Sequence, residues 1–260
     1  MLKTALILAM MLLALGGLFP GSGSALEVDR GGYGDALLIP YFDVTNLDTL
    51  ISIESNNMTY QVVQVRFRAA ATGAEALAFT LCLTPLGSWT AGMTANGSTA
   101  QILSSSTMLA DGTPGLNRLL AGNTTRGYIE VIGLREGGTS QAICADPSQG
   151  AATSNFSLLA RTYYVAAATT PILAFGTNAI AFRDFSTVKL SGSETMLGNQ
   201  AVAQALTANS NFSGTAFSFR YFVEPSLQAQ TVIVLTFPAG ADGCAACAIP
   251  PQVPHHALRG

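Results

Sequence analysis

The stretch QVVQVRFR, residues 61–68, alternates apolar and polar side chains one residue at a time. Val63, Val65 and Phe67 fall on one side of an extended chain, while the intervening glutamine and arginines fall on the other. A period of two is typical of a half-buried antiparallel strand, because successive side chains of a strand point to opposite faces of its sheet. The stretch therefore predicts a strand with one face against a hydrophobic core.

The same alternation recurs along most of the chain. It is clear in ALAFTLCL (76–83) and AFSFRYFV (216–223), and TLISIES, GYIEVIGL, RTYYVAAA, NAIAFRDF and TVIVLTF are further candidate strands. Clusters of Gly, Asn, Ser and Thr separate the runs as turns require, and ESNNMT (54–59) predicts a hairpin loop. Together these patterns predict an all-β fold over residues 26–238, an antiparallel β-sandwich of the jelly-roll or immunoglobulin-like kind.

Two segments depart from this period. SETMLGNQAVAQALTAN (193–209) brings its larger apolar side chains roughly onto one helical stripe, which predicts one inserted α-helix near residues 194–208. PGLNRLLAG (114–122) predicts a shorter helical turn. A parallel sheet built from βαβ units would need many more helices than these, so we expect the sheets to be antiparallel.

Residues 1–25 show the three parts of a secretory signal peptide. Lys3 supplies a positive charge, the run Ala5–Phe19 is uncharged, and the small residues Gly23 and Ala25 suit a cleavage site. The apolar run falls short of the roughly 20 residues that span a bilayer, which favours cleavage over a membrane anchor. We therefore expect a secreted, extracellular or cell-surface protein, or a periplasmic one, with no membrane span after cleavage.

The composition argues against two classes of partner and against disorder. Only 10% of the residues are charged and 49% are apolar, so the chain can fill a core and does not resemble a disordered protein. Lys and Arg number 12 against 15 Asp and Glu, and they form no basic cluster. The electrostatic footprint of nucleic-acid binding is therefore missing, and an acidic membrane surface is no better a partner.

Four cysteines are disulfide candidates, since an exported protein matures in an oxidising compartment. They are Cys82, Cys144, Cys244 and Cys247. Four cysteines allow three pairings, and the sequence alone does not choose between them. A bridge from Cys82 to Cys144 would close a loop of more than about 60 residues and stabilise the fold by roughly 4 kcal/mol. The alternative for Cys82 is a buried free thiol.

The tail, residues 239–260, is rich in Ala, Gly and Pro and holds a Cys-x-x-Cys pair. A c-type haem needs a histidine directly after such a pair, where this chain has Ala248. A thioredoxin-like site needs a βαβ unit around the pair. The four potential zinc ligands are Cys244, Cys247, His255 and His256, but prolines separate the two pairs. We therefore expect a structural disulfide here, with no metal and no cofactor.

Catalytic groups are scarce, and we expect the protein not to be an enzyme. Both histidines lie in the tail, so a Ser-His-Asp arrangement is not available inside the sandwich. A carboxylate-based glycoside hydrolase would have to use Asp43, Asp48 or Glu54, which more simply belong to a turn. A carbohydrate-binding module is the other alternative, and its stacking residues would be Trp89, Tyr41 and Tyr33.

Five segments, in this order, resemble a family of secreted proteins of Gram-negative bacteria. They are GDALLIPYFDVTNLDTLISIES, VVQVRFR, FTLCLTPLGSWTAGM, RGYIEVIGL and VIVLTFP. The resemblance extends over most of the region from Gly34 to Pro238. It implies a β-rich surface or extracellular protein without an assigned activity. Its motifs are strand and turn signatures, so it implies no catalytic or ligand-binding residue.

The first functional hypothesis is therefore a non-enzymatic structural or adhesive protein that binds its own kind or a surface. A sheet with an open edge can accept an extended segment of a neighbouring molecule as an additional strand. The glycine-rich segment LEVDRGGYGDALLIPYF (26–42) is the donor that we expect. The expected partners are thus further copies, other cell-surface components or a polysaccharide.

Overall fold

The computed structural model describes residues 27–29, 32–45, 47–138, 142–145, 151–152, 157–166 and 173–183. Several sequence predictions fall outside these residues. They are the signal peptide (1–25), the helix near 194–208, the candidate strands at 216–223 and 231–237, and the tail (239–260) with Cys244, Cys247 and both histidines.

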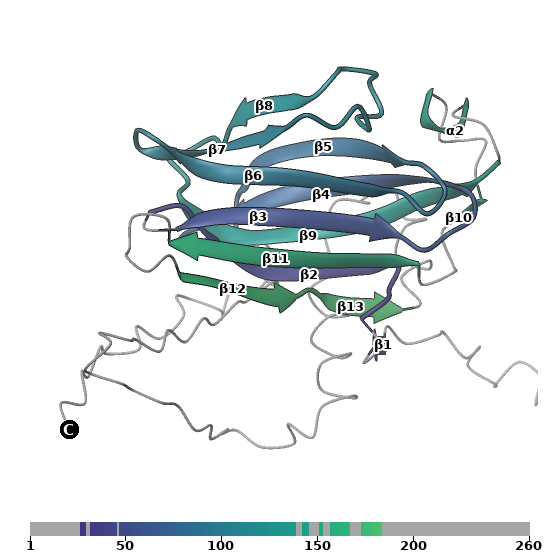
Figure 1. The fold of residues 1–260 in the computed structure, drawn as a ribbon, viewed down its shortest axis with the longest axis horizontal. Coiled ribbons are helices and arrows are strands. Elements are labelled where there is room, and N and C mark those ends of the chain that lie inside the picture. The colour runs from purple at the N-terminus through teal and green to yellow at the C-terminus, as the bar shows by residue number, and fades with distance from the viewer. Residues whose placement is uncertain are drawn as a thin grey trace, which may run out of the picture.

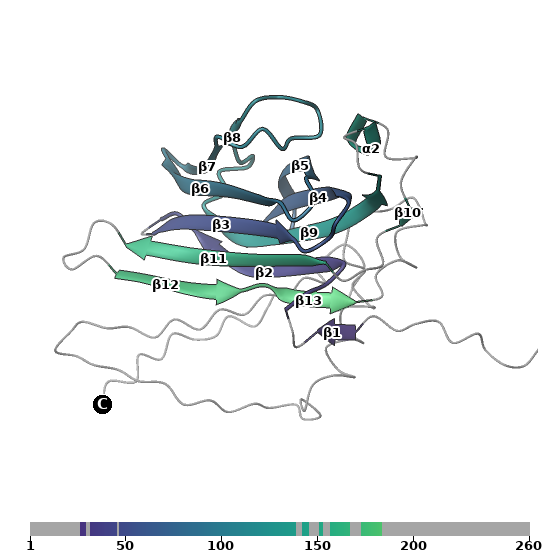
Figure 2. The ribbon, with the colours of Figure 1, turned by 45° about the vertical axis from the view of Figure 1, so that its right-hand side comes forward.

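Two antiparallel sheets pack face to face (Figures 1 and 2). Sheet A has the order β1-β13-β2-β9-β4-β5, with β10 beside β9, and sheet B has the order β12-β11-β3-β6-β7-β8. The strands of sheet A are β1 (Glu27–Asp29), β2 (Ala36–Asp43), β4 (Tyr60–Ala69), β5 (Glu75–Leu83), β9 (Arg126–Gly137), β10 (Ala151–Ala152) and β13 (Ile180–Arg183). The strands of sheet B are β3 (Asp48–Ser55), β6 (Ser88–Asn96), β7 (Thr99–Ser104), β8 (Leu116–Leu119), β11 (Leu158–Ala166) and β12 (Leu173–Asn178). The predicted all-β antiparallel sandwich is confirmed.

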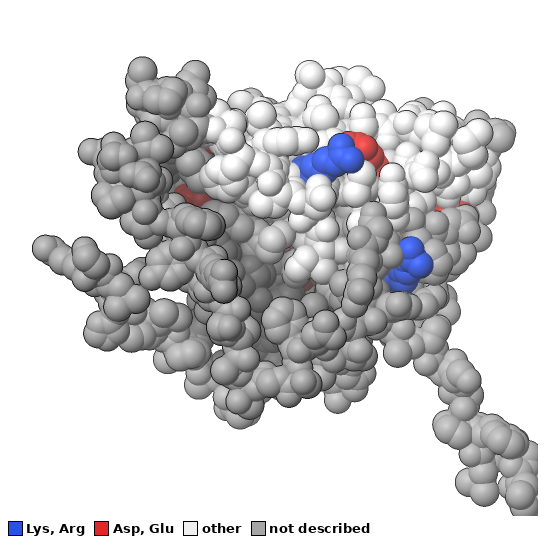
Figure 3. Space-filling model, turned by 60° about the horizontal axis from the view of Figure 1, so that its bottom comes forward, with Lys and Arg blue, Asp and Glu red and all other residues white. Residues whose placement is uncertain are grey.

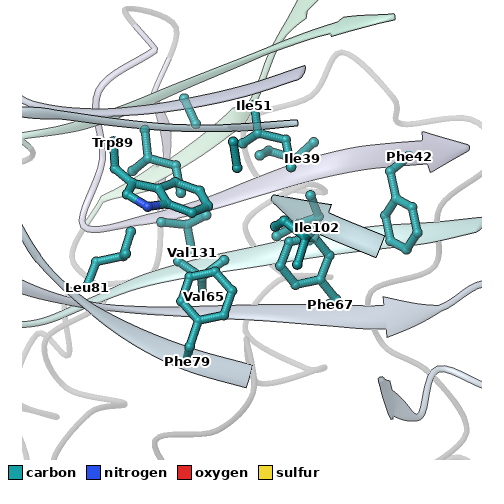
Figure 4. Packing of buried hydrophobic residues seen from close by; sticks show 14 of the residues in the cluster. Ile39, Phe42, Ile51, Val65, Phe67, Phe79, Leu81, Trp89, Ile102 and Val131 are labelled. Carbon is teal, nitrogen blue, oxygen red and sulfur yellow. The ribbon is translucent and has the colours of Figure 1, made fainter. Parts of the chain in front are cut away.

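The core lies between the two sheets and follows the alternation in the sequence. Val63, Val65 and Phe67 of β4 all point into it and are at most 1% exposed. Trp89 of sheet B packs against Phe79 of sheet A, with 5.5 Å between the ring centroids (Figure 4). Burial of these large side chains from both sheets holds the layers together.

The segment ESNNMT (54–59) is not the predicted hairpin loop. It leaves β3 in sheet B and enters β4 in sheet A, so it crosses between the layers. The Ser55 hydroxyl donates a hydrogen bond to Gln61 at 2.6 Å, and the Asn57 amide donates one to Glu136 at 2.7 Å. Because Asn and Ser serve tight hairpins and crossovers equally well, their presence did not distinguish the two connections.

The segment 114–122 does not form the predicted helical turn. Leu116–Leu119 is strand β8, which pairs with β7. Gly115 and Gly122 on either side of it have positive φ angles of 77° and 68°, which favour glycine and set the strand off from its loops. Hydrogen bonding to a neighbouring strand thus outweighs the local helix propensity of the leucines and arginine.

The outer face of sheet A is buried as well. Arg66 and Arg68 of β4 point away from the core, as the alternation predicts, but each is only 5% exposed. The Arg68 Nε lies 3.2 Å from Glu130, which is fully buried, and Arg66 lies 3.4 Å from Glu75. Burial raises the pKa of Glu130 despite the opposing effect of Arg68.

A disulfide joins Cys82 of β5 to Cys144 of the short helix α2 (Ala142–Ala145). It lies on the outer face of sheet A with Val62 and Ile143, which are also buried. The Cys82–Cys144 bridge considered in the sequence analysis is thereby established, and Cys82 is not a free thiol. Disulfides are typical of oxidising, non-cytoplasmic compartments.

Over the part of the chain that the structure describes, no helix has the length and apolar character needed to cross a membrane.

Candidate functional site: the edge strand β12

The free edge of β5 in sheet A is covered by its own chain. The backbone N–H of Cys82 donates to the carbonyl of Met108 at 2.7 Å, and that of Ala110 donates to Thr80 at 2.9 Å. Farther along β5, the N–H of Ala121 donates to the Ala76 carbonyl at 2.9 Å. These bonds use up edge groups that would otherwise be available to another molecule.

Strand β12 at the edge of sheet B is different. It pairs with β11 from Arg161↔Asn178 to Ala166↔Leu173, and no described strand pairs with its other side. Its sequence, LAFGTN, holds no charged residue and no proline, and its pairing with β11 shows no bulge. Charges, prolines and bulges are the features that normally protect an edge strand from pairing with other chains. Strand β12 has none of them, and residues 174–178 are all exposed.

The other described edges are shorter or charged. Strand β1 has three residues, of which Glu27 and Asp29 are acidic. Strand β8 has four residues and carries Arg118, whose guanidinium lies 3.8 Å from Asp111. A hollow of about 560 Å³ is lined by β8, by the loop that leads into it and by the end of β7. Among the described edges, β12 is therefore the one best suited to accept a strand.

Phe175 gives this edge an exposed aromatic ring. It is paired with Tyr164 of β11, so both rings are on the inner face of sheet B, and they stack with centroids 4.8 Å apart. Tyr164 is 2% exposed, whereas Phe175 is 54% exposed. A large apolar ring on the core-facing side of a sheet is normally covered, so this exposure marks the edge as an incomplete surface.

An uncharged row on the outer face of sheet B leads to the same edge. Strand pairing aligns Gly176, Tyr163, Leu50, Gly92 and Leu103 across five neighbouring strands. The three larger residues are each more than 40% exposed. A Cβ at Gly176 would come within 2.9 Å of the Tyr163 ring, so this ring lies over the glycine. The view from the side of β12 and β13 shows few charged groups on the described surface (Figure 3).

The residues predicted to stack against a sugar do not form one platform. Trp89 is 0% exposed, because it lies between the sheets, and its indole therefore has no face for a ligand. Gly34, the neighbour of Tyr33, pairs with Leu158 of β11. Tyr41 packs against Tyr164, six residues or roughly 20 Å farther along that strand. The residues chosen for the carbohydrate-binding alternative therefore do not meet.

Two of the predicted hydrolase carboxylates lie too far apart to act as a pair. Asp48 and Glu54 are both on β3, six residues apart, which corresponds to roughly 20 Å along a strand. Glycoside hydrolysis needs two carboxylates about 5–9.5 Å apart. Within the described ranges, no group of three or more His, Cys, Asp or Glu residues is placed to hold a metal ion.

Asp43 has a structural role in the turn between β2 and β3. Its carboxylate accepts hydrogen bonds from the Tyr41 hydroxyl at 2.6 Å and from the backbone N–H of Thr45 at 2.7 Å. Arg126 of β9 approaches it to 3.1 Å. Burial alone would raise the pKa of Asp43, but the hydrogen bonds and Arg126 outweigh burial, and the pKa is lowered. Burial and the same carboxylate raise the pKa of Tyr41.

We expect Asp43→Asn to remove a pH-dependent part of the stability. Because folding lowers the pKa of Asp43, its contribution is complete above the unfolded value of about 3.9 and is lost as the pH falls through the folded value. The variant should be less stable than the wild type by roughly 1–2 kcal/mol at pH 7, with the difference shrinking below about pH 4. Urea unfolding measured from pH 2 to pH 7 checks this, and Asp48→Asn controls for the loss of one carboxylate. An equal difference at every pH would contradict it.

The N-terminal segment predicted as the donor strand lies in the chain's own sheet A. Strand β2 is hydrogen-bonded to both β13 and β9, and its residues Leu37 and Ile39 are fully buried in the core. Strand β1 pairs with β13. Residues 36–42 cannot leave this position without exposing the core, so they do not serve as a free donor in this fold.

Strand β12 itself was missed in the sequence, where only the following run, NAIAFRDF, was interpreted as a strand. The signal that could have found it is the alternation of Leu173, Phe175 and Thr177, which are good strand formers. Comparisons with known protein families, with curated proteins and with solved structures found no match.

Proposed function

We propose that this protein is a non-enzymatic structural protein, secreted or at the cell surface, that assembles by β-strand addition at β12. The observation that carries the proposal is the edge itself. It offers six residues without charge, proline or bulge, and one side of the strand has no partner among the described strands. An extended segment can extend sheet B there through main-chain hydrogen bonds.

Two further observations support assembly at this place. The exposed ring of Phe175 supplies apolar area that an added strand would cover, and burial of apolar area is the main favourable term in association. The disulfide between Cys82 and Cys144 fits an exported protein, as does the signal peptide predicted for residues 1–25. Export would bring the edge into contact with other copies outside the cytoplasm.

We expect Thr177→Lys to weaken assembly by roughly tenfold or more, because a lysine on an edge strand disfavours pairing with another strand. Thr177 is exposed, but it lies on the inner face and its side chain hydrogen-bonds to Tyr164, so circular dichroism and a urea-unfolding curve first establish that the variant is folded. The matched control is Thr90→Lys on β6, which is also exposed but has partners on both sides, β3 and β7. Sedimentation velocity over a concentration series measures the association of the wild type and both variants.

Association that is lost in Thr177→Lys and retained in Thr90→Lys would support the proposal. A wild type that stays monomeric at millimolar concentration would overturn it. Equal association of all three proteins would show that they assemble through another surface and would overturn it as well.

A further inference from the structure

Building on the proposed function, we infer that the strand added to β12 is the β12 of a second copy. The two strands run antiparallel across a two-fold axis that passes at Phe175, so that each Phe175 faces its own copy. Sheet B then continues across the axis into the second copy, and the pair closes as a dimer. Three properties of this edge carry the inference: its lack of charge, the face on which each side chain lies, and the exposed aromatic ring.

Charge is the first argument. A two-fold axis places every residue near it beside its own copy, so a charged residue there meets a like charge. Self-pairing of β1 would bring its acidic residues, Glu27 and Asp29, together, and self-pairing of β8 would bring Arg118 close to its copy. Strand β12 carries no charge in its six residues. The other uncharged edge, β10, has only two residues, so β12 is the longest described edge that can meet itself without electrostatic repulsion.

The pairing geometry limits the register. Residues directly opposite each other in an antiparallel pair point to the same face of the sheet. A two-fold axis perpendicular to the sheet keeps the inner face of both copies on one side. Phe175 must therefore face another inner-face residue of β12. Two such registers overlap the two strands over most of their length. Either Phe175 faces Phe175, or Gly176 faces Gly176 and Phe175 faces Thr177.

The exposed ring favours the first register. The two Phe175 rings would then lie side by side on the inner face, each backed by the ring of Tyr164 at 4.8 Å. Four aromatic rings would form one continuous cluster and cover the side chain that is 54% exposed in the single subunit. In the second register each phenylalanine faces a threonine, and the contact between the two rings is lost.

The outer face accommodates the same register. The register with Phe175 facing Phe175 places Gly176 opposite Ala174 of the second copy, and these are the two smallest residue types. The uncharged row that ends at Tyr163 and Gly176 would continue into the second subunit without a steric obstacle. A strand of six residues spans only about 20 Å, so the interface is small and the association should be reversible.

Cysteine cross-linking tests the register. In the Phe175→Cys variant, the two introduced cysteines would lie opposite each other at a Cα separation of about 4.5–5.5 Å, which suits a disulfide. In the control Thr177→Cys, the two cysteines would be displaced by four residues, or about 13 Å, and could not bond. Both variants are made with Cys244→Ala and Cys247→Ala to prevent disulfide exchange. Mild oxidation at high protein concentration followed by non-reducing electrophoresis gives the result.

We expect covalent dimers in Phe175→Cys and at least roughly tenfold fewer in Thr177→Cys. Circular dichroism and the intact Cys82–Cys144 bridge confirm that both variants are folded, which the exposed positions of the two residues favour. Cross-linking only in an equal mixture of the two variants would show the second register and overturn the inference about Phe175.

One further outcome separates this inference from the proposed function. Wild-type association that Thr177→Lys abolishes, without cross-links in either cysteine variant or their mixture, would overturn pairing with a second β12. Strand addition at the edge would still stand, with a different strand as donor. A wild type that never associates would overturn both.

Discussion

Replacing both Cys82 and Cys144 with alanine is expected to lower the free energy of unfolding by about 4 kcal/mol. The two residues are 62 positions apart in the sequence, so the disulfide removes much of the conformational freedom of the unfolded chain. Both side chains are buried, with 2% and 6% exposed, and alanine keeps their environment apolar. Guanidinium chloride denaturation of the double variant and the wild type, without reductant, measures the difference.

The matched control is the double variant Cys244→Ala/Cys247→Ala, which removes the same number of cysteines from the tail. Reduction of the wild type should reproduce the loss seen in the Cys82/Cys144 variant, since both treatments open the same loop. A Cys82/Cys144 variant as stable as the wild type would contradict the prediction, and so would a wild type that reductant leaves unchanged.

Replacing Gly127 with alanine is expected to cost roughly 3 kcal/mol or more, and the variant could fail to fold. A Cβ at this position would overlap the carbonyl oxygen of Arg68, and it would also lie 2.8 Å from the Phe42 ring. The first obstacle is backbone of β4, which can move only if the β4–β9 pairing between Ala69 and Gly127 opens. The midpoint of thermal unfolding and the yield of folded protein measure the effect.

Gly92→Ala provides the comparison, because Gly92 is also a strand glycine. Its nearest neighbour would be a methyl carbon of Leu50 at 3.6 Å, an ordinary van der Waals distance. We expect this variant to stay within about 0.5 kcal/mol of the wild type. Similar stability for Gly127→Ala and Gly92→Ala would show that the contact with Arg68 does not constrain the strand pairing.

Local patterns in the sequence predicted which segments are strands and which of their faces are buried. The alternation in β4 placed Val65 and Phe67 in the core, and the alternation in β5 did the same for Phe79 and Leu81. This succeeds because the direction of a side chain in a strand depends only on its position along that strand. The class of fold follows from many such segments without any knowledge of their partners.

Which strands pair with each other depends on residues far apart in the sequence. The predictions that were wrong concern this pairing. The Asn- and Ser-rich segment 54–59 looks like a hairpin until its two strands are known to belong to different sheets. The segment 114–122 has helix-forming residues, but it becomes a strand because β7 offers it hydrogen bonds. The N-terminal segment 26–42 looked like a free donor, although β9 and β13 bind it within its own subunit.

The candidate site could not be predicted for a similar reason. The sequence LAFGTN is short and has no residue that signals chemistry, and its meaning depends on its place at the end of sheet B. Trp89 shows the opposite case, because a lone tryptophan suggests a binding surface, whereas the packing of Phe79 against it makes it part of the core. Composition identifies unusual residues, but only the fold decides whether they are accessible.

Strands β12 and β13 are one continuous run of backbone that changes sheet at Ala179, where the N–H donates to the Ala160 carbonyl at 2.9 Å. Force applied to β12 by a bound neighbour is therefore transmitted through the backbone to β13, which belongs to the other sheet. Tension along this run acts parallel to the strands and perpendicular to their hydrogen bonds, so it would load the bonds of both sheets together in shear instead of breaking them one at a time. The force needed to separate two subunits joined at β12 would then depend on the rupture of entire ladders, and the two layers would resist that force as one unit.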